Sequence, residues 1–320
     1  MLGAGCSGAS PGTADATASA APSSSPSGAP AVTAGAEPLA GAEIAVGSKD
    51  YDEQLVLGQI STQALAAAGV TVVDHLNLGD TAAVRDALLS DQIDHYWEYT
   101  GIGWLVHLDN AEKLSDPQEQ WRRVRDADRA NGVAWTTPAP FNNTYGIAVT
   151  RRAAGRLGDP QTLSDFARLA EDSTGKATLC VDGEFASRAD GLPGLAQTYG
   201  FELPDDNVTT LDPGVVYSAI STRDPCNFGE VFTTDGRIAA LDLQVLDDDA
   251  GFFPIYNAAP VFSADTYQRH GRALDVLFAP IAAALTQKTM IALNKQVSAD
   301  GELPEDVARS FLSDNDLLPE

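Results

Sequence analysis

Basic residues are scarce in this sequence. Its 320 residues include 20 Lys and Arg against 45 Asp and Glu, which gives a formal net charge of -25 at pH 7. A surface of this sign repels phosphate backbones, so nucleic acid is a poor partner and we expect none. The same charge keeps a protein hydrated and attracts cations.

Long apolar segments and common enzyme motifs are missing as well. No run of 18 apolar residues occurs, so no segment is predicted to span a membrane. The sequence has no GxxxxGK[ST] phosphate loop and no HExxH zinc motif. A hydrolase or transferase would need a nucleophile paired with a base, and no spacing indicates such a pair. We therefore expect no catalytic residue and no cofactor.

The N-terminal segment differs from the rest of the chain. Leu2-Gly3-Ala4-Gly5-Cys6 is similar to the end of a bacterial lipoprotein signal, in which small residues precede a lipid-bearing Cys. We expect residues 1–6 to be the remnant of such a signal, with Cys6 as the lipidation site; the alternative is a chance Cys. Residues 7–42 are nearly all Ala, Ser, Pro, Gly and Thr, which predicts a disordered linker. Together they indicate an extracytoplasmic protein held at a bacterial membrane only by lipid.

Cysteine is also rare. Beyond Cys6 the sequence contains only Cys180 and Cys226, with no CxxC pair, and its four His are scattered. We therefore expect no metal site. In an exported protein, the two further Cys predict one disulfide between Cys180 and Cys226. Two buried thiols are the alternative.

From residue 43 onward, short apolar strands alternate with amphipathic helices. Strands are expected at 43–48, 70–76, 93–99, 133–140, 145–150 and 177–181, and later helices at 117–130, 266–285, 287–296 and 304–313. Asp50 and Glu53 have the spacing of a capping box for the first helix, and Asp80 or Thr81 should cap the second. This alternation is typical of an α/β fold with parallel sheets, arranged here as two lobes around a cleft.

The stretch HYWEYTGIGW, residues 95–104, holds four aromatic side chains at a strand-to-helix boundary. Because ligands bind at the carboxyl ends of parallel strands, Tyr99 and Thr100 should lie beside a pocket. Trp97 must point to the opposite face of the strand from Tyr96. Tyr145, in FNNTY, and Tyr256, in FFPIYN, occur in similar settings. Tyrosine rings attract a cation by about 0.5–2 kcal/mol each, and a quaternary ammonium suits them because it has no N–H to satisfy. Each Tyr could instead be a core residue.

An ordered series of motifs covers residues 43–318: VGSKDYDEQLVLGQI, DHYWEYTGIG, FNNTYGIAV, FASRADGLPGLAQTYG and TTDGRIAALDLQVLDDDAGFFPIYNAAPVF. With them the chain resembles the substrate-binding lipoproteins of glycine betaine/choline/carnitine ABC importers. The resemblance implies a type II periplasmic-binding-protein fold, with lobe I formed by 43–146 and 258–320 and lobe II by 147–257. It also implies a monomer that delivers a small quaternary amine to ABC permease subunits and carries out no catalysis.

The resemblance also implies a set of ligand-binding residues. The predicted set is Gln54, Tyr96, Tyr99, Thr100, Asn142, Tyr145, Tyr217 and Tyr256. Tyr145, Tyr217 and Tyr256 are the first candidates for an aromatic cage around the ammonium group, and Tyr96 is the next. Gln54, Thr100 and Asn142 would hold the polar end. Ile102 stands where the family often has a polar residue, which removes one hydrogen-bond partner for that end.

Two alternatives remain open. The same fold could bind an amino acid or another polar solute, whose N–H groups would need Asp or Glu in the cleft. A surface lipoprotein that binds a solute without transporting it is the other.

Overall fold

The computed structural model describes residues 38–318. Cys6 and residues 7–37 of the expected linker lie outside the described residues. The folded part begins before the expected start at residue 43, because Leu39 is already buried and packs on the core. Residues 38–42 therefore belong to the folded chain and not to the linker.

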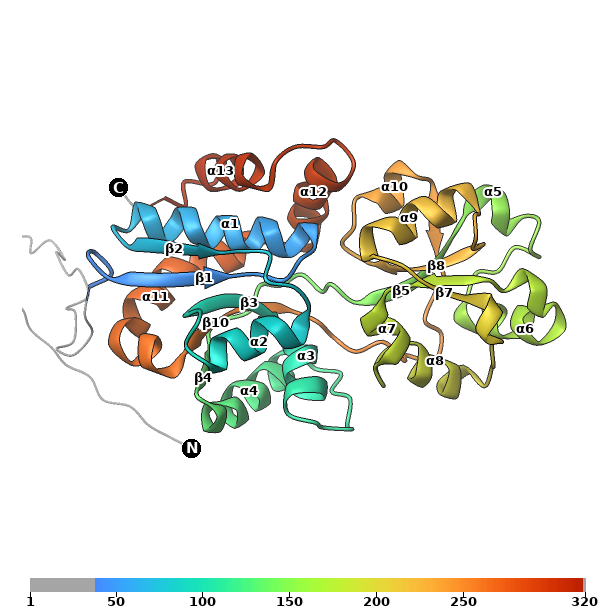
Figure 1. The fold of residues 1–320 in the computed structure, drawn as a ribbon, viewed down its shortest axis with the longest axis horizontal. Helices are drawn as coiled ribbons and strands as arrows, with labels where there is room; N and C mark the ends of the chain where they lie inside the picture. Colours follow the sequence, from blue (N-terminus) through green and yellow to red (C-terminus); the bar gives the residue numbers. More distant parts are fainter. Residues whose placement is uncertain (1–37, 319–320) are drawn as a thin grey trace, which may run out of the picture. The chain divides into compact units, whose positions relative to one another are not determined.

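The first sheet has the strand order β2-β1-β3-β10-β4 (Figure 1). Its strands are β1 Glu43–Gly47, β2 Thr71–His75, β3 His95–Tyr99, β4 Val133–Trp135 and β10 Ala258–Ser263. β1 is parallel to β2 and β3, as the strand-helix alternation predicted. β10 is antiparallel to β3 and β4, because the chain returns from the second sheet at the carboxyl end of β3, where Ala258 pairs with Tyr99.

The second sheet has the order β7-β6-β8-β5-β9. Its strands are β5 Tyr145–Thr150, β6 Leu179–Val181, β7 Val208–Thr210, β8 Phe228–Phe232 and β9 Leu243–Val245. β6 is parallel to β7 and β8, and β5 is antiparallel to β8 and β9. The central strand β8 was not predicted from the sequence. Two α/β sheets in one chain agree with the expected fold class.

Two segments of chain join the sheets (Figure 1). The first lies between Trp135 and Tyr145 and the second between Val245 and Ala258. They pair with each other, since the backbone N–H of Asn143 donates to the carbonyl of Tyr256 at 3.0 Å. The expected boundary after residue 146 falls inside β5, so the first crossing comes slightly earlier than expected.

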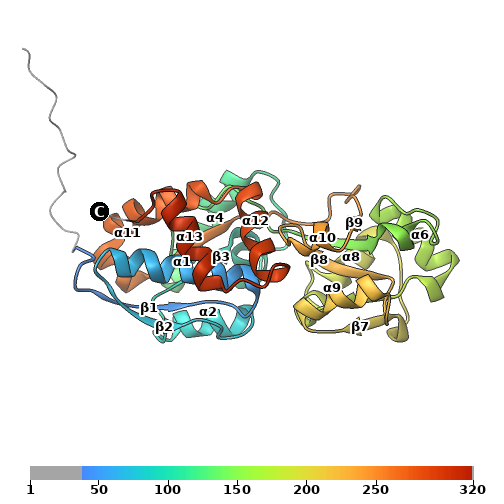
Figure 2. The same cartoon turned by 90° about the horizontal axis from the view of Figure 1, so that it is seen from above.

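Helices cover both faces of the first sheet (Figure 1 and Figure 2). They are α1 Asp52–Ala67, α2 Thr81–Leu89, α3 Thr100–Ile102, the π-helical turn η1 Gly103–His107, α4 Pro117–Asp128, η2 Arg129–Asn131, α11 Ala264–Ala284, α12 Gln287–Ser298 and α13 Pro304–Asp314. Trp97 packs in the cluster that contains α1, α11 and α13, whereas Tyr96 packs with α2 and α4. The prediction that these neighbours point to opposite faces is confirmed.

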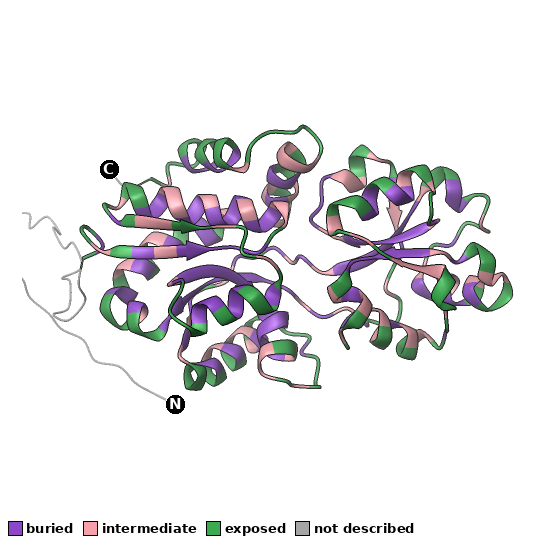
Figure 3. Cartoon of the chain, in the orientation of Figure 1, coloured by how far each residue is buried: buried purple, intermediate pink, exposed green. Residues whose placement is uncertain are grey.

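The second sheet is covered in the same way. Its helices are α5 Arg151–Ala154, α6 Leu163–Asp172, η3 Thr174–Lys176, α7 Gly183–Ser187, α8 Leu192–Tyr199, η4 Asp205–Asn207, α9 Pro213–Thr222 and α10 Arg237–Ala240. Figure 3 shows the strands of both sheets mostly buried, with exposed residues on the outer sides of the helices. Ile220 of α9 belongs to a small cluster with Val231, while Phe166 of α6 belongs to the large one.

Among residues 38–318, no single helix is long and apolar enough to cross a membrane. Helices α11 and α12 reach that length and composition only as a pair, which is bent by 84°.

The two helix starts with a predicted cap differ. Asp80 caps α2 by accepting a hydrogen bond from the N–H of Ala83 at 2.9 Å, which confirms one of the two alternatives. The capping box predicted at Asp50 and Glu53 is wrong. The N-cap of α1 is Tyr51, which makes no side-chain capping bond. The carboxylate of Glu53 is instead buried and accepts side-chain hydrogen bonds from distant parts of the chain.

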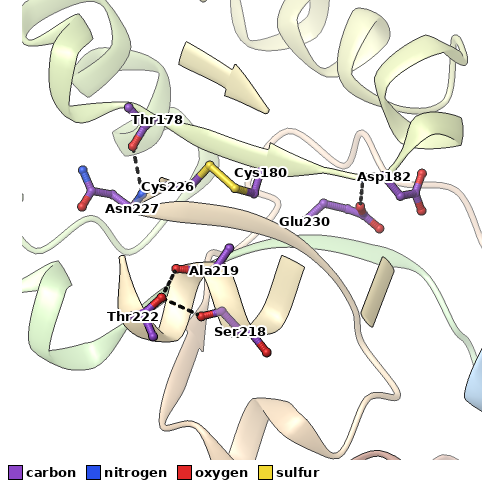
Figure 4. Close-up of a disulfide and its surroundings, with 9 residues drawn as sticks. All are labelled: Thr178, Cys180, Asp182, Ser218, Ala219, Thr222, Cys226, Asn227 and Glu230. Atoms are coloured by element: carbon purple, nitrogen blue, oxygen red, sulfur yellow. Dashed lines mark hydrogen bonds between the residues drawn. A yellow bond between two sulfur atoms is a disulfide. The ribbon is translucent and has the colours of Figure 1, made fainter. Parts of the chain in front are cut away.

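The predicted disulfide between Cys180 and Cys226 is confirmed. Figure 4 shows the bond between Cys180 on β6 and Cys226, which precedes β8 by two residues. Both Cys are buried beside Val216 of α9. The bond therefore links β6 to the start of its neighbour β8, next to α9.

Candidate functional site

A cavity of about 1050 Å³ lies at the carboxyl end of β3. Its walls come from both halves of the chain: the segments after β1, β2 and β3 on one side, and the segments after β6 and β7 with the end of β8 on the other. A cavity bounded by strand ends of two α/β sheets is the usual place for a small ligand in such folds.

Five aromatic rings line this cavity, and we call them the aromatic wall: Tyr51, Tyr99, Tyr145, Phe232 and Tyr256. The ring centroid of Tyr145 lies 5.3 Å from that of Phe232 and 5.8 Å from that of Tyr256. Tyr51 stacks on Phe232 at 5.4 Å. These contacts join four of the rings into one group that includes residues from both halves of the chain.

Gly101 explains how Tyr256 enters this wall. A Cβ atom at position 101 would lie 2.5 Å from the Cδ1 atom of Tyr256 and 2.6 Å from the carbonyl oxygen of Ile255. Any other residue at this position would push the second joining segment away. The glycine of EYTG is therefore needed for a close approach between α3 and the segment that carries Tyr256.

Carboxylates behind the wall hold two of its phenol groups. The hydroxyl of Tyr99 donates to Glu53 Oε1 at 2.7 Å, and that of Tyr256 donates to Asp190 Oδ2. Burial and the neighbouring carboxylates raise the pKa of Tyr99 and of Tyr256 well above the ordinary value. Both side chains are therefore neutral phenols with a fixed orientation.

Three basic side chains that are paired with carboxylates also line the cavity: Lys49 and Arg85, which are buried, and Arg188, which is half-buried. Lys49 Nζ donates to Glu98 Oε1 at 2.7 Å and lies 5.2 Å from the ring centroid of Tyr99. Burial raises the pKa of Glu98, but Lys49 and His107 outweigh burial and hold that pKa well below its ordinary value. Glu98 is thus a charged anchor for Lys49. An ammonium has three donors, so Lys49 can bind a ligand as well as Glu98.

Arg188 is held in a similar way. Its Nε donates to Asp190 Oδ1 at 2.8 Å and its Nη1 donates to Glu184 Oε2 at 2.8 Å. Neither Lys49 nor Arg188 is among the residues predicted from the sequence, although they lie in the quoted motifs GSKDYDEQ and FASRADG. A single basic residue within such a motif, in a chain poor in basic residues, was the signal that could have found them.

The structure brings three of the predicted ligand-binding residues to the cavity: Tyr99, Tyr145 and Tyr256. Ile102, the apolar residue after EYTG, lines it too. Asn143 lines the cavity, but its predicted neighbour Asn142 is not among the lining residues. The Oδ1 atom of Asn142 instead accepts from the backbone N–H of Tyr256 at 2.7 Å.

Two predicted cage residues lie elsewhere. Tyr96 is fully buried in the α2 cluster, and its hydroxyl donates to Glu98 Oε2 at 3.0 Å. Tyr217 is covered by Arg237, whose guanidinium carbon lies 4.0 Å from the ring centroid. Its hydroxyl accepts from the N–H of Phe232 at 2.9 Å. Neither ring lines the cavity, so the predicted cage role of these two residues is not supported by the geometry.

Two predicted polar contacts also lie behind the cavity surface. Gln54 is fully buried in α1. Thr100 Oγ1 accepts from Gln120 Nε2 at 2.9 Å and is fully buried. Neither residue lines the cavity.

No metal site accompanies the cavity in the part of the chain that the structure describes, because no three His, Cys, Asp or Glu side chains are grouped suitably there. The site consists of aromatic rings, three basic side chains anchored by carboxylates, and several further carboxylates. Such a set can bind a small ligand that carries both a positive charge and a polar end.

Comparison with known proteins agrees with this site. Residues 42–314 match the family described as the substrate-binding domain of ABC-type glycine betaine transport systems. The chain belongs to this family. Its members are extracytoplasmic substrate-binding proteins of ABC importers and are not enzymes.

Individual relatives cover most of the chain. The glycine-betaine-binding protein of Pseudomonas aeruginosa is 40% identical over 289 residues, which cover 88% of this chain and 91% of that protein. The glycine betaine-binding protein YehZ of Escherichia coli is 34% identical over 279 residues, covering 85% and 90% of the two chains. The solved structure of apo YehZ from E. coli superposes with a TM-score of 0.62 at 33% identity, over 86% of this chain and 99% of that one.

Proposed function

We propose that this protein binds a quaternary amine such as glycine betaine or choline in the cavity and delivers it to the permease of an ABC importer, without any catalytic step. The observation that carries the proposal is the aromatic wall, in which five rings line one cavity. Ring faces attract a cation, and a trimethylammonium group needs no hydrogen-bond acceptor. The relatives from P. aeruginosa and E. coli are named for glycine betaine, a ligand of this class.

The polar end of the ligand would face Lys49 and Arg188. Both lie in the cavity wall, and each is fixed by a carboxylate behind it. Glycine betaine carries a carboxylate and choline a hydroxyl, and both groups can accept from these donors. The two ends of the ligand would thus be bound by different parts of one cavity.

The ligand-binding residues proposed are therefore Tyr99, Tyr145 and Tyr256 from the sequence prediction, with Tyr51, Phe232, Lys49 and Arg188 added from the structure. Cys6 is proposed to carry the lipid anchor, and the protein is proposed to act as a monomer. Replacing Cys6 with Ser should release the protein from the membrane fraction if the anchor is lipid at this position.

Titration calorimetry with glycine betaine, choline, carnitine and proline betaine tests the proposal. At least one of them should bind. The neutral choline analogue 3,3-dimethylbutan-1-ol is the matched control, because it has the same shape without the charge and should not bind. Absence of heat and of any thermal shift with all four amines would contradict the proposal. Binding of an amino acid in their place would favour the alternative ligand class.

A further inference from the structure

Glu184 connects the two halves of the chain across the cavity. It lies in α7, beside the second sheet, and its Oε1 accepts from the backbone N–H of Thr81 at 2.9 Å. Its Oε2 accepts from the hydroxyl of Thr81 at 3.1 Å. Thr81 is the first residue of α2, beside the first sheet. The same Oε2 accepts from Arg188 Nη1 at 2.8 Å, and all three residues line the cavity.

Arg188 is therefore paired with two carboxylates before any ligand arrives. Asp190 accepts from its Nε and Nη2 atoms, and Glu184 accepts from its Nη1 atom. A ligand carboxylate at Arg188 would be a third anion on one guanidinium. Like charges within a few ångströms repel, and the repulsion is stronger where water is partly excluded. A ligand that ends in a hydroxyl brings no such charge.

We propose that Glu184 is a specificity-determining residue, which weakens the binding of quaternary amines that carry a carboxylate relative to those that end in a hydroxyl. This inference rests on the proposed function and concerns the polar end of the same cavity. Thr81 contributes differently from Glu184, because its two hydrogen bonds hold Glu184 beside Arg188 but add no net charge. The charge of Glu184 and its attachment to Thr81 can therefore be tested with separate variants.

Affinities for glycine betaine and choline should be measured by calorimetry for the wild type and for Glu184→Gln. The amide keeps an acceptor for Thr81 and removes the charge. We expect the ratio of the two Kd values to shift by about tenfold in favour of glycine betaine. Asp86→Asn is the matched control, since it removes one negative charge from the cavity lining at a residue that does not pair with Arg188. Its ratio should change by less than about twofold.

Thr81→Val separates attachment from charge. It removes the hydroxyl bond but keeps the carboxylate, so both ligands should bind more weakly with little change in their ratio. If both ligands bind the wild type and the ratio of their Kd values is unchanged in Glu184→Gln, the inference is overturned. The proposed function then stays intact. Equal shifts in Thr81→Val and Glu184→Gln would also overturn the inference. If neither ligand binds the wild type, the proposed function itself fails. If Glu184→Gln does not fold, the same ratio of Kd values is measured for Glu184→Ala, whose folding is checked by circular dichroism.

Discussion

Lys49 and Glu98 form a buried ion pair at the base of the cavity, with 2.7 Å between Nζ and Oε1 and side-chain exposures of 2% and 0%. Lys49 follows β1, and Glu98 lies in β3, so the pair joins the ends of two adjacent strands. It also places a positive charge next to the ring of Tyr99. The pair thus links the stability of the first sheet to the electrostatics of the cavity.

Breaking this pair should destabilise the protein strongly. Lys49→Met leaves Glu98 buried without its main counter-charge, and we expect a loss of about 3–5 kcal/mol in the free energy of unfolding. Urea unfolding of Lys49→Met, of Glu98→Gln and of the double variant measures it. The double variant should lose less than the sum of the two single losses, because it leaves no unpaired charge. Additive losses would show that the two side chains do not interact.

The cage role of Tyr145 can be tested by truncation. Tyr145→Ala removes a ring that contacts Phe232 and Tyr256 within the wall, so quaternary amines should bind about 1–3 kcal/mol more weakly. Tyr267→Ala is the control, since Tyr267 lies on α11 and bonds to Asp275 outside the cavity. An unchanged Kd in a folded Tyr145→Ala variant would remove Tyr145 from the site.

His95 should make the protein less stable in mild acid. Burial lowers the pKa of His95 from 6.5 to about 4. The unfolded chain therefore takes up a proton at a higher pH than the folded one. Stability from this group is complete above the unfolded pKa of 6.5 and falls as the pH decreases toward 4, by about 3 kcal/mol in total.

The free energy of unfolding, measured by urea titration between pH 7 and pH 4, tests this expectation. His95→Gln should show a flatter dependence than the wild type over that range. The stability of His95→Gln at pH 7 does not test this expectation, because the substitution also removes a ring that stacks on Phe262 at 4.4 Å between centroids. Parallel curves for the two proteins would rule out His95 as the source of the slope.

The disulfide should contribute to stability through the unfolded chain. Cys180 and Cys226 are 46 positions apart, and closing a loop of this length stabilises the folded state by about 4 kcal/mol on the chain-entropy account. The double variant Cys180→Ser with Cys226→Ser should unfold at a lower urea concentration by a corresponding amount. Wild-type protein in reductant should approach the variant. Equal midpoints under oxidising conditions would contradict this prediction.

Local sequence patterns predicted much of the fold. The alternation along β3 placed Tyr96 and Trp97 on opposite faces, because successive side chains of a strand point in opposite directions. The position before an apolar helix limited the cap of α2 to Asp80 or Thr81, and Asp80 makes the capping bond. The same kind of reasoning failed at Glu53, whose spacing from Asp50 fits a capping box but whose carboxylate is used elsewhere. β8 was not predicted, since FGEVF is a short segment with a carboxylate in its middle.

The residues of the aromatic wall show more clearly what could not be predicted from the sequence. Tyr145 and Tyr217 look equally suitable in the sequence, yet Tyr145 lines the cavity and the ring of Tyr217 is covered by Arg237. Phe232 ends the unpredicted strand, and Tyr51 received no role from its motif. Which ring faces the cavity depends on how the sheets and their connections pack, and spacing along the chain does not contain that information.

The sequence by itself determined the α/β class, the order of most elements and the disulfide pairing, and it indicated three of the five rings that line the cavity. These follow from short-range periodicity, residue composition and a recognisable series of motifs. Only the tertiary structure decided which side chains meet. Glu53 accepts hydrogen bonds from Tyr99, Asn143, Thr234 and Asn294, which are 46, 90, 181 and 241 positions away. A buried carboxylate must be hydrogen-bonded, but the donors come from whichever strands, turns and helices the fold brings to it.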